Sequence, residues 1–386
     1  MAKIPGEASL RAKILLALSC FFGTIVLIEG SARLFMDPPP FNSLPGLSPN
    51  EMEHDHLLWH HRPGFIDHEG SDNGPINSHG FRGPEISTAK PVGRFRILSL
   101  GESTSYGDSI DWHQTYAHVL EQTLKDEGVN AEAINAGVRG WSTFQSAQLL
   151  ALRIDDLQPD LVLVYHEVND FLPTSFRGLQ VSGAGMNDIE MLKFLQHRSY
   201  AKWLIEHSRF LSGWRVKLAR NRASATERLV ADLAKKDVLV MPSLPYKTLP
   251  GTIDDEKPWM DNPSQLVRLP DPQRQQVLES IVDLTRSRKV QLILLHPTYP
   301  VSKPHRCILT RVATDFKVPM IDIETLLRAD AMPFGRRKSD YFRQGDKFHP
   351  NVLGHATIGR GISDFIIENN MIPPKSRLES TKAGKD

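Results

Sequence analysis

One stretch decides how the chain folds: residues 96–108, which read RILSLGESTSYGD. An apolar run stops at Gly101, a serine follows two residues later, and an amphipathic segment begins near Trp112. This pattern predicts a buried strand, a tight turn and the start of a helix. In an open α/β sheet such a turn lies at the carboxyl edge, where ligands bind. Ser103 is therefore either a reactive serine beside anion-binding backbone N–H groups or an ordinary helix cap.

Strands and helices alternate on both sides of a long interruption. Strands are predicted at 95–100, 131–135, 160–165, 290–295 and 320–323, and helices at 115–126, 143–157, 273–288, 303–316 and 352–369, with a short helix from 324. This alternation predicts a parallel sheet with right-handed crossovers. Residues 171–272 break it and form an insertion. Inserted segments at the ligand edge often shape substrate access, although a decorative helical cap would have the same pattern. Its tryptophans are Trp203, Trp214 and Trp259.

Composition excludes some classes of partner and of site. The 386 residues include 46 basic and 45 acidic side chains, so no strong positive field exists for nucleic acid. Cys20 and Cys307 lie too far apart in sequence to suggest a disulfide or a metal frame. A histidine-rich patch has irregular spacing and no HExxH-type frame, so we predict no metal site there. Its members are His54, His56, His60, His61 and His68.

The N-terminus carries a targeting signal. Residues 14–28 are uncharged and follow Lys3, Arg11 and Lys13. The helical pattern continues to Phe35, and no small-x-small cleavage site follows, so we expect an uncleaved signal anchor. The basic flank puts the N-terminus in the cytoplasm and the remainder outside, periplasmic or at the cell surface. Secretion after cleavage of a signal peptide is the alternative. A buried core helix would not explain the terminal position.

Four regions follow from these patterns. Residues 1–36 hold the cytoplasmic N-terminus and the single transmembrane anchor, and residues 37–92 form an extracytoplasmic lead-in punctuated by proline. Residues 93–372 form the main α/β domain with the insertion at 171–272, and residues 373–386 form a polar tail that we expect to be disordered. Within the lead-in, residues 77–85 (NSHGFRGPE) are expected to dock onto the main domain.

Chemically distinctive residues end successive elements at one edge of the predicted sheet. Ser103 follows the first strand, Gly137 the second and Asn169 the third, and Asp346 and His349 precede the last helix. Singly, each has an ordinary explanation as a cap, a turn glycine, an Asx turn or a helix start. Their joint occurrence in this order indicates a catalytic site.

Acyl transfer requires these residue types. A serine hydroxyl is a weak nucleophile until a histidine takes its proton, and an aspartate orients that histidine. With Asp346 three residues before His349, one tight turn would place the carboxylate beside the imidazole ring. The N–H groups of Ser103 and Gly137 and the amide of Asn169 would bind the oxyanion. Such a triad needs neither a metal nor an organic cofactor.

These pieces resemble the four blocks of the SGNH hydrolases, also called the GDSL esterase/lipase family, whose last block reads D-x-x-H-P. The resemblance covers about residues 94–370. Residues 77–83 also resemble the N-S-x-G-F-R-G segment of membrane-anchored bacterial members. The resemblance to the SGNH hydrolases implies a flavodoxin-like three-layer α/β/α sandwich with a parallel sheet. The residues it implies are Ser103 as nucleophile, His349 as base, Asp346 as its orienter, and Gly137 and Asn169 completing the oxyanion hole.

Two departures and two further histidines qualify this resemblance. Glu102 stands where the family name has Asp, and Glu167 stands at the glycine of the third block, G-x-N-D. Neither change removes a reacting group. His296 ends a predicted strand without an acid at a matching offset, and His355 lies in the last helix, where we expect it to pack.

We expect a serine esterase that hydrolyses O-acyl esters through an acyl-serine intermediate, on a lipid or glycan of the cell envelope. One alternative is an O-acyltransferase acting on a surface polysaccharide, which the basic loop 336–338 (RRK) would suit. A second alternative is a non-catalytic surface-binding module on the same fold. The acyl chain length, the alcohol partner and the oligomeric state are left open by the sequence.

Overall fold

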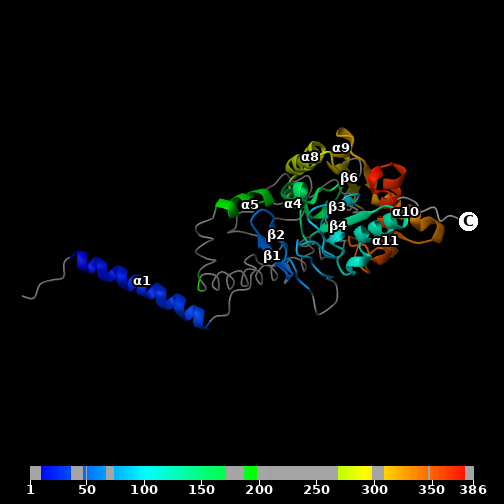
Figure 1. Cartoon of the computed structure of the whole chain (residues 1–386). Coiled ribbons are helices and arrows are strands. Elements are labelled where there is room, and N and C mark those ends of the chain that lie inside the picture. The colour runs from blue at the N-terminus through cyan, green and yellow to red at the C-terminus, as the bar shows by residue number, and fades with distance from the viewer. Residues whose placement is uncertain are drawn as a thin grey trace, which may run out of the picture.

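The computed structural model of the protein describes residues 10–35, 47–48, 50–66, 74–170, 187–197, 208, 210, 268–297, 308–346 and 348–378. Helices cover both faces of a central sheet, and the N-terminal helix lies apart from them (Figure 1). The three tryptophans noted in the insertion lie outside the described residues.

The central sheet is parallel, and the described chain contributes five strands to it. These are β3 (Phe95–Gly101), β4 (Ala131–Gly137), β5 (Leu161–Tyr165), β6 (Gln291–His296) and β7 (Met320–Asp322). Their order is β4-β3-β5-β6-β7, which confirms the predicted flavodoxin-like sheet. The chain leaves β3 for β4 on one side and returns to β5 on the other. Ligands bind at such a reversal, so the turn after β3 lies at the expected site position.

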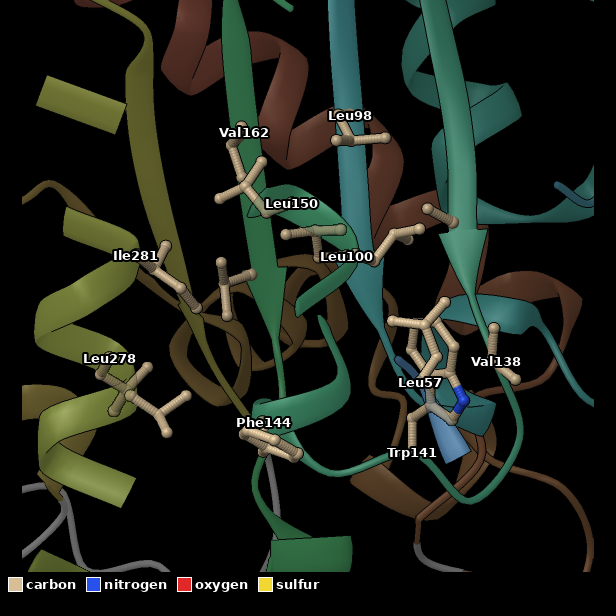
Figure 2. Close-up of a cluster of buried hydrophobic side chains, with 14 of the residues drawn as sticks. Leu57, Leu98, Leu100, Val138, Trp141, Phe144, Leu150, Val162, Leu278 and Ile281 are labelled. Carbon is tan, nitrogen blue, oxygen red and sulfur yellow. The ribbon is translucent and has the colours of Figure 1, made fainter. Parts of the chain in front are cut away.

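Helices form a layer on each face of the sheet. One layer holds α3 (Tyr116–Asp126), α10 (Ile323–Ala331) and α11 (Val352–Glu368), and the other α4 (Thr143–Leu157), α8 (Asp271–Ser287) and α9 (Ile308–Asp315). Side chains alternate along a strand, so Leu98 and Leu100 enter the α4–α8–α9 core and Ile97 enters the other. Figure 2 shows Leu98 and Leu100 in one cluster with Val162 of β5 and Ile281 of α8.

The remaining elements are short. They are the antiparallel strands β1 (Glu51–His54) and β2 (Leu58–His61), helices α2 (Ser103–Tyr106) and α5 (Asp188–His197), and 3-10 helices at Trp112–Gln114, Val168–Asp170, Met332–Phe334, Lys338–Tyr341 and Pro374–Ser376. One boundary differs from the prediction with a consequence for the site. Strand β4 continues two residues beyond Asn135, so Gly137 is its last residue rather than part of the following turn.

Helix α1 (Leu10–Phe35) has 26 residues and continues past the apolar core of the N-terminal stretch. At 1.5 Å per residue it is about 39 Å long, more than the ~30 Å hydrocarbon core of a bilayer. Its large apolar side chains are exposed along its length. The segment Lys13–Phe35 is long and apolar enough to span a membrane or to act as a signal sequence.

The lead-in shares a core with the main domain, which corrects the boundary predicted between residues 92 and 93. Trp59 and Phe81 lie fully buried in the same cluster as the strand residues that face α4. Arg82, also buried, donates hydrogen bonds to the carbonyls of Tyr106, Gly107 and Ile110. These contacts confirm that the segment 77–85 docks on the main domain. Leu58 and Trp59 of strand β2 belong to this core.

The beginning of the C-terminal tail is ordered, contrary to the prediction for residues 373–386. The N–H of Asn130 donates to the carbonyl of Ser376 at 2.8 Å, and the N–H of Leu378 donates to the carbonyl of Gly128, also at 2.8 Å. Backbone groups beside the start of β4 therefore find partners in the tail, which a polar composition does not reveal. Residues 379–386 lie outside the described part of the chain.

Replacing Arg82 tests whether the lead-in is integral to the fold. We expect Arg82→Ala to lower the free energy of unfolding by about 3 kcal/mol, because it removes the guanidinium hydrogen bonds to three buried carbonyls. The measurement is urea unfolding followed by tryptophan fluorescence. Arg328→Ala is the control, because Arg328 pairs with Glu324 at the surface and should contribute less than about 1 kcal/mol. Equal losses in the two variants would contradict an integral lead-in.

Candidate active site

Ser103 begins α2, a single helical turn directly after β3. The N-cap residue of this turn is Glu102, whose side chain makes no capping hydrogen bond. The Ser103 hydroxyl is partly exposed and lies 2.9 Å from Nε2 of His349. Ser103 is therefore not the helix cap that its local sequence also allowed, and its hydroxyl faces a histidine.

Asp346, His349 and Ser103 form one chain of hydrogen bonds. Oδ2 of Asp346 lies 2.6 Å from Nδ1 of His349, and Oδ1 accepts the backbone N–H groups of Phe348 and His349 at 2.7 and 3.1 Å. A proton on Nδ1 donated to Asp346 leaves Nε2 free to accept the Ser103 hydroxyl. The structure thus brings together all three residues that the sequence proposed for the triad.

The Asp346 carboxylate is held in its charged form. Partial burial by itself would raise its pKa, but the hydrogen bond and charge of His349, with the two backbone N–H donors, lower the pKa of Asp346 to about 2. The group therefore remains an anion throughout the neutral and mildly acidic range. An anion at this position orients the imidazole and stabilises the imidazolium that forms when His349 takes a proton.

Gly137 ends strand β4 and its N–H is already bonded, so its predicted assignment to the oxyanion hole is corrected. Its N–H already donates to Oδ1 of Asn135 at 3.0 Å, so it is not a free donor. Gly137 is needed for space instead. A Cβ atom there would lie 2.4 Å from the backbone N of Tyr106 and 2.8 Å from Cβ of Ser105. The turn that carries Ser103 rests directly on this glycine.

Gly140, three residues further on, offers the donor that Gly137 does not. Its backbone N–H makes no hydrogen bond with any residue that the structure describes. It belongs to a turn closed by the Trp141 N–H and the Val138 carbonyl at 3.2 Å, and its φ is 72°. Type II turns require such a value at their third residue, where glycine is favoured. The sequence signal for this donor is the second glycine of the block 137–140.

Asn169 lies beside that turn. Its side-chain Nδ2 donates one hydrogen bond to the carbonyl of Trp141 at 3.0 Å. An amide nitrogen carries two protons, so a second one is left for a ligand. The backbone N–H of Asn169 donates to Oε2 of the buried Glu102 at 3.3 Å. The residue that departs from the family name thus connects the first block to the third.

Glu167, the second departure, is buried and lies beside Arg274. Its Oε1 lies 3.6 Å from a guanidinium nitrogen of Arg274, which also pairs with Asp170 at 2.9 Å. Asp170 accepts the N–H of Thr143 at 2.7 Å and its hydroxyl at 2.5 Å. Burial raises the pKa of Asp170, while Arg274 and Thr143 act in the opposite direction. These groups anchor the start of α4 and do not form a second reacting pair.

The other histidines have packing partners. The ring of His60 packs at a tilt against Trp141, and that of His61 packs at a tilt against Tyr106. Burial lowers the pKa of His60 to about 4, so its ring is neutral at pH 7. His355 is buried and accepts the Tyr116 N–H at 3.1 Å, which confirms its packing position. His68 lies outside the described residues.

His296 has an acid partner that the sequence did not reveal. Its Nδ1 lies 3.7 Å from Oδ1 of Asp322, because β6 and β7 bring the two residues into register. Asp322 also caps α10 through the N–H of Glu324. A carboxylate on the neighbouring strand cannot be recognised by its offset along the chain.

Replacing Gly137 distinguishes a space requirement from a catalytic N–H. We expect Gly137→Ala to lower the free energy of unfolding by about 3 kcal/mol, because the added methyl group meets backbone atoms of the nucleophile turn. Gly361→Ala is the control, since the atoms nearest to a methyl group there belong to the side chain of Leu326 and not to the backbone. Chemical denaturation measures both. A Gly137→Ala protein of unchanged stability would contradict the space requirement.

Comparison with known proteins agrees with this geometry. The GDSL-like Lipase/Acylhydrolase family matches residues 99–357, which is more than half of the chain. No curated protein matches the chain. Among solved structures, the psychrotrophic esterase EstA from Pseudoalteromonas sp. is 14% identical, with a TM-score of 0.39, and the match covers 72% of this chain and 98% of that one.

Two further solved structures are similar. TesA is 14% identical with a TM-score of 0.37, over 70% of this chain and 97% of that one. A catalytic mutant of Axe2, an acetylxylan esterase from Geobacillus stearothermophilus, is 12% identical with a TM-score of 0.37, over 71% and 93%. With identities of 14% or less and TM-scores below 0.5, these likenesses carry no argument about this protein. The family match and the serine–histidine–aspartate chain lead to one conclusion: this protein belongs to the GDSL-like lipase/acylhydrolase family and is a serine hydrolase of ester bonds.

Proposed function

We propose that the protein cleaves carboxylic esters through an acyl-serine intermediate at Ser103. The observation that carries this proposal is the continuous hydrogen-bond chain from Asp346 through His349 to Ser103. A binding module without catalysis would have no need for a histidine held at 2.9 Å from a partly exposed serine hydroxyl. The chain supports nucleophilic catalysis over that alternative.

Each step uses a group already in position. Nε2 of His349 takes the hydroxyl proton as Oγ of Ser103 bonds to the ester carbonyl carbon. The tetrahedral intermediate collapses, the bond to the alcohol oxygen breaks, and the imidazolium gives its proton to the leaving alkoxide. A water molecule then attacks the acyl-serine, with His349 again as base, and releases the carboxylic acid and free Ser103.

Oxyanion stabilisation is assigned to three donors. The N–H of Ser103, the N–H of Gly140 and the second amide proton of Asn169 make no hydrogen bond to other residues that the structure describes. Donors fixed before the reaction stabilise the developing charge without reorganising. The carboxylate of Glu102 accepts the backbone N–H of Asn169 and so helps to position that residue.

The N-terminal helix supports a substrate in the cell envelope. We take Lys13–Phe35 to be a single-pass signal anchor, because the basic residues before it favour a cytoplasmic N-terminus. The active site would then lie outside the cytoplasm, next to ester-bearing lipids and glycans. Ester lipids and O-acylated glycans of the envelope are therefore the substrates to test.

Acyl transfer to a glycan would use the same acyl-serine. The basic loop 336–338 offers this alternative little support, because each of its cations faces a carboxylate. Arg336 pairs with Asp330, Arg337 lies beside Asp340, and Lys338 pairs with Glu324, at 3.3, 4.0 and 3.0 Å. Mass analysis after incubation with an acyl donor and a glycan separates the two reactions, since hydrolysis releases free acid and transfer yields acylated glycan.

Substitution of the nucleophile tests the proposed function directly. We expect Ser103→Ala to lower kcat for a short-chain aryl ester by at least about 10³-fold, because the proposed acyl-enzyme forms on this hydroxyl. Stability should change little, since the hydroxyl is partly exposed. A fluorophosphonate should label Ser103 of the unmodified protein. Full activity in the variant would show that Ser103 is not the nucleophile.

The acidic side of the pH profile tests the state of the dyad. The pKa of Asp346 is lowered to about 2, so its carboxylate should take up no proton between pH 4 and 7. A plot of log kcat/KM against pH should therefore not exceed a slope of one in this range. A limiting slope of two would mean that the carboxylate also takes up a proton in this range.

A further inference from the structure

Three consecutive backbone carbonyls in the turn after β4 are each held by a side chain from a different part of the chain. Nε1 of Trp59 donates to the carbonyl of Arg139 at 3.3 Å. A guanidinium nitrogen of Arg268 donates to the carbonyl of Gly140 at 2.5 Å, and Asn169 donates to the carbonyl of Trp141 at 3.0 Å. Figure 2 shows Trp141 just beyond the end of β4, beside Leu57 of the lead-in.

The bond from Trp59 sets the direction of the Gly140 N–H. In a trans peptide, the Arg139 carbonyl and the Gly140 N–H lie in one plane and point in opposite directions. This peptide is the central one of the turn, and type I and type II turns differ by a flip of that peptide. A donor on the Arg139 carbonyl stabilises one orientation, in which the Gly140 N–H points away from Trp59.

Arg268 contacts the same turn and makes several other buried polar contacts. It is 1% exposed and forms a bidentate pair with Asp188, at 3.1 and 2.7 Å. It also donates to Oε1 of Gln145 at 2.9 Å, and its guanidinium lies 5.4 Å from the ring centre of Trp59. Asp188 accepts the Ser142 hydroxyl at 2.7 Å. Hydrogen bonds between charged groups are stronger than neutral ones, and the planar fork of Arg matches this geometry.

The Asp188–Arg268 pair joins two segments that are far apart in the sequence. Asp188 and Arg268 lie near the two ends of the insertion, 80 residues apart, and both contact the segment that follows β4. A buried ion pair alone is weak evidence of stabilisation, because desolvation opposes the attraction. Here the arginine also satisfies a buried carbonyl within the turn next to the nucleophile.

We propose that Trp59 and Arg268 are positioning residues. They hold the Val138–Trp141 turn in the conformation that presents the Gly140 N–H to the oxyanion. The inference rests on the proposed function and deepens it. Neither side chain reacts with the substrate. They act through the backbone of the turn, so that the lead-in and the end of the insertion both form part of the catalytic apparatus.

Two variants test this proposal in the full-length protein. Arg268→Lys keeps the charge but loses the fork, and Trp59→Phe keeps the ring but loses the N–H. We expect Arg268→Lys to lower kcat for a short-chain aryl ester by about 10- to 100-fold and Trp59→Phe by a smaller factor, with KM within about two-fold, because an oxyanion donor acts mainly on the transition state. The rate of Ser103 labelling by a fluorophosphonate should fall in parallel.

Arg96→Lys is the matched control. Arg96 is equally buried and donates to the carbonyls of Ser87, Thr88 and Leu157, but it lies at the start of β3, at the opposite edge of the sheet. Its replacement should lower the melting temperature without lowering kcat per folded molecule.

The outcomes separate this inference from the proposed function. If the unmodified protein neither hydrolyses esters nor takes up the label, the proposed function fails and the inference fails with it. If it does both, but folded Arg268→Lys and Trp59→Phe proteins are as fast as Arg96→Lys, the inference is overturned while the proposed function stands. Should Arg268→Lys not fold, Trp59→Phe decides, because its ring continues to fill the core.

Discussion

The close contact between the nucleophile turn and the end of β4 is the constraint on which the site depends. Gly101 and Gly137 are paired in register at the carboxyl ends of β3 and β4. A methyl group on Gly101 would lie 2.5 Å from Cβ of Ser105, and one on Gly137 would meet backbone atoms of the same turn. With both side chains absent, α2 rests on the strand ends. This contact places the Ser103 hydroxyl where a histidine from a distant loop can reach it.

Loops at the same edge of the sheet form the remainder of the site, and buried arginines from other segments bind them. Arg82 of the lead-in donates to backbone carbonyls in the turn after Ser103. Arg274 pairs with Asp170, which accepts a hydrogen bond from the start of α4. Buried arginines suit this purpose, because one planar group can donate to several carbonyls or carboxylates at once. The segments before and after the strands thus serve as scaffolding for catalytic loops, not as separate modules.

Local and tertiary determinants can be told apart residue by residue. The Asp346–His349 pair was predictable, because a three-residue spacing lets one turn join the carboxylate to the ring. The alternation of strands and helices predicted the sheet for the same reason, since periodicity is a local property of the chain. Gly137 was misassigned because its N–H donates to the side chain of Asn135, a contact that composition does not reveal. The Asp322 partner of His296 was missed because it comes from a neighbouring strand.

The sequence by itself determined the parallel α/β architecture and the apolar N-terminal helix, and it singled out the three residues that the structure brings together in one hydrogen-bond chain. These follow from hydrophobic periodicity and from side-chain types at the ends of strands. Only the tertiary structure decided which glycine offers a free N–H, where the buried charges find partners, and that Trp59 and Arg268 converge on one turn. Such features depend on the directions of peptide planes and on contacts between segments far apart in sequence, which no local pattern of residues encodes.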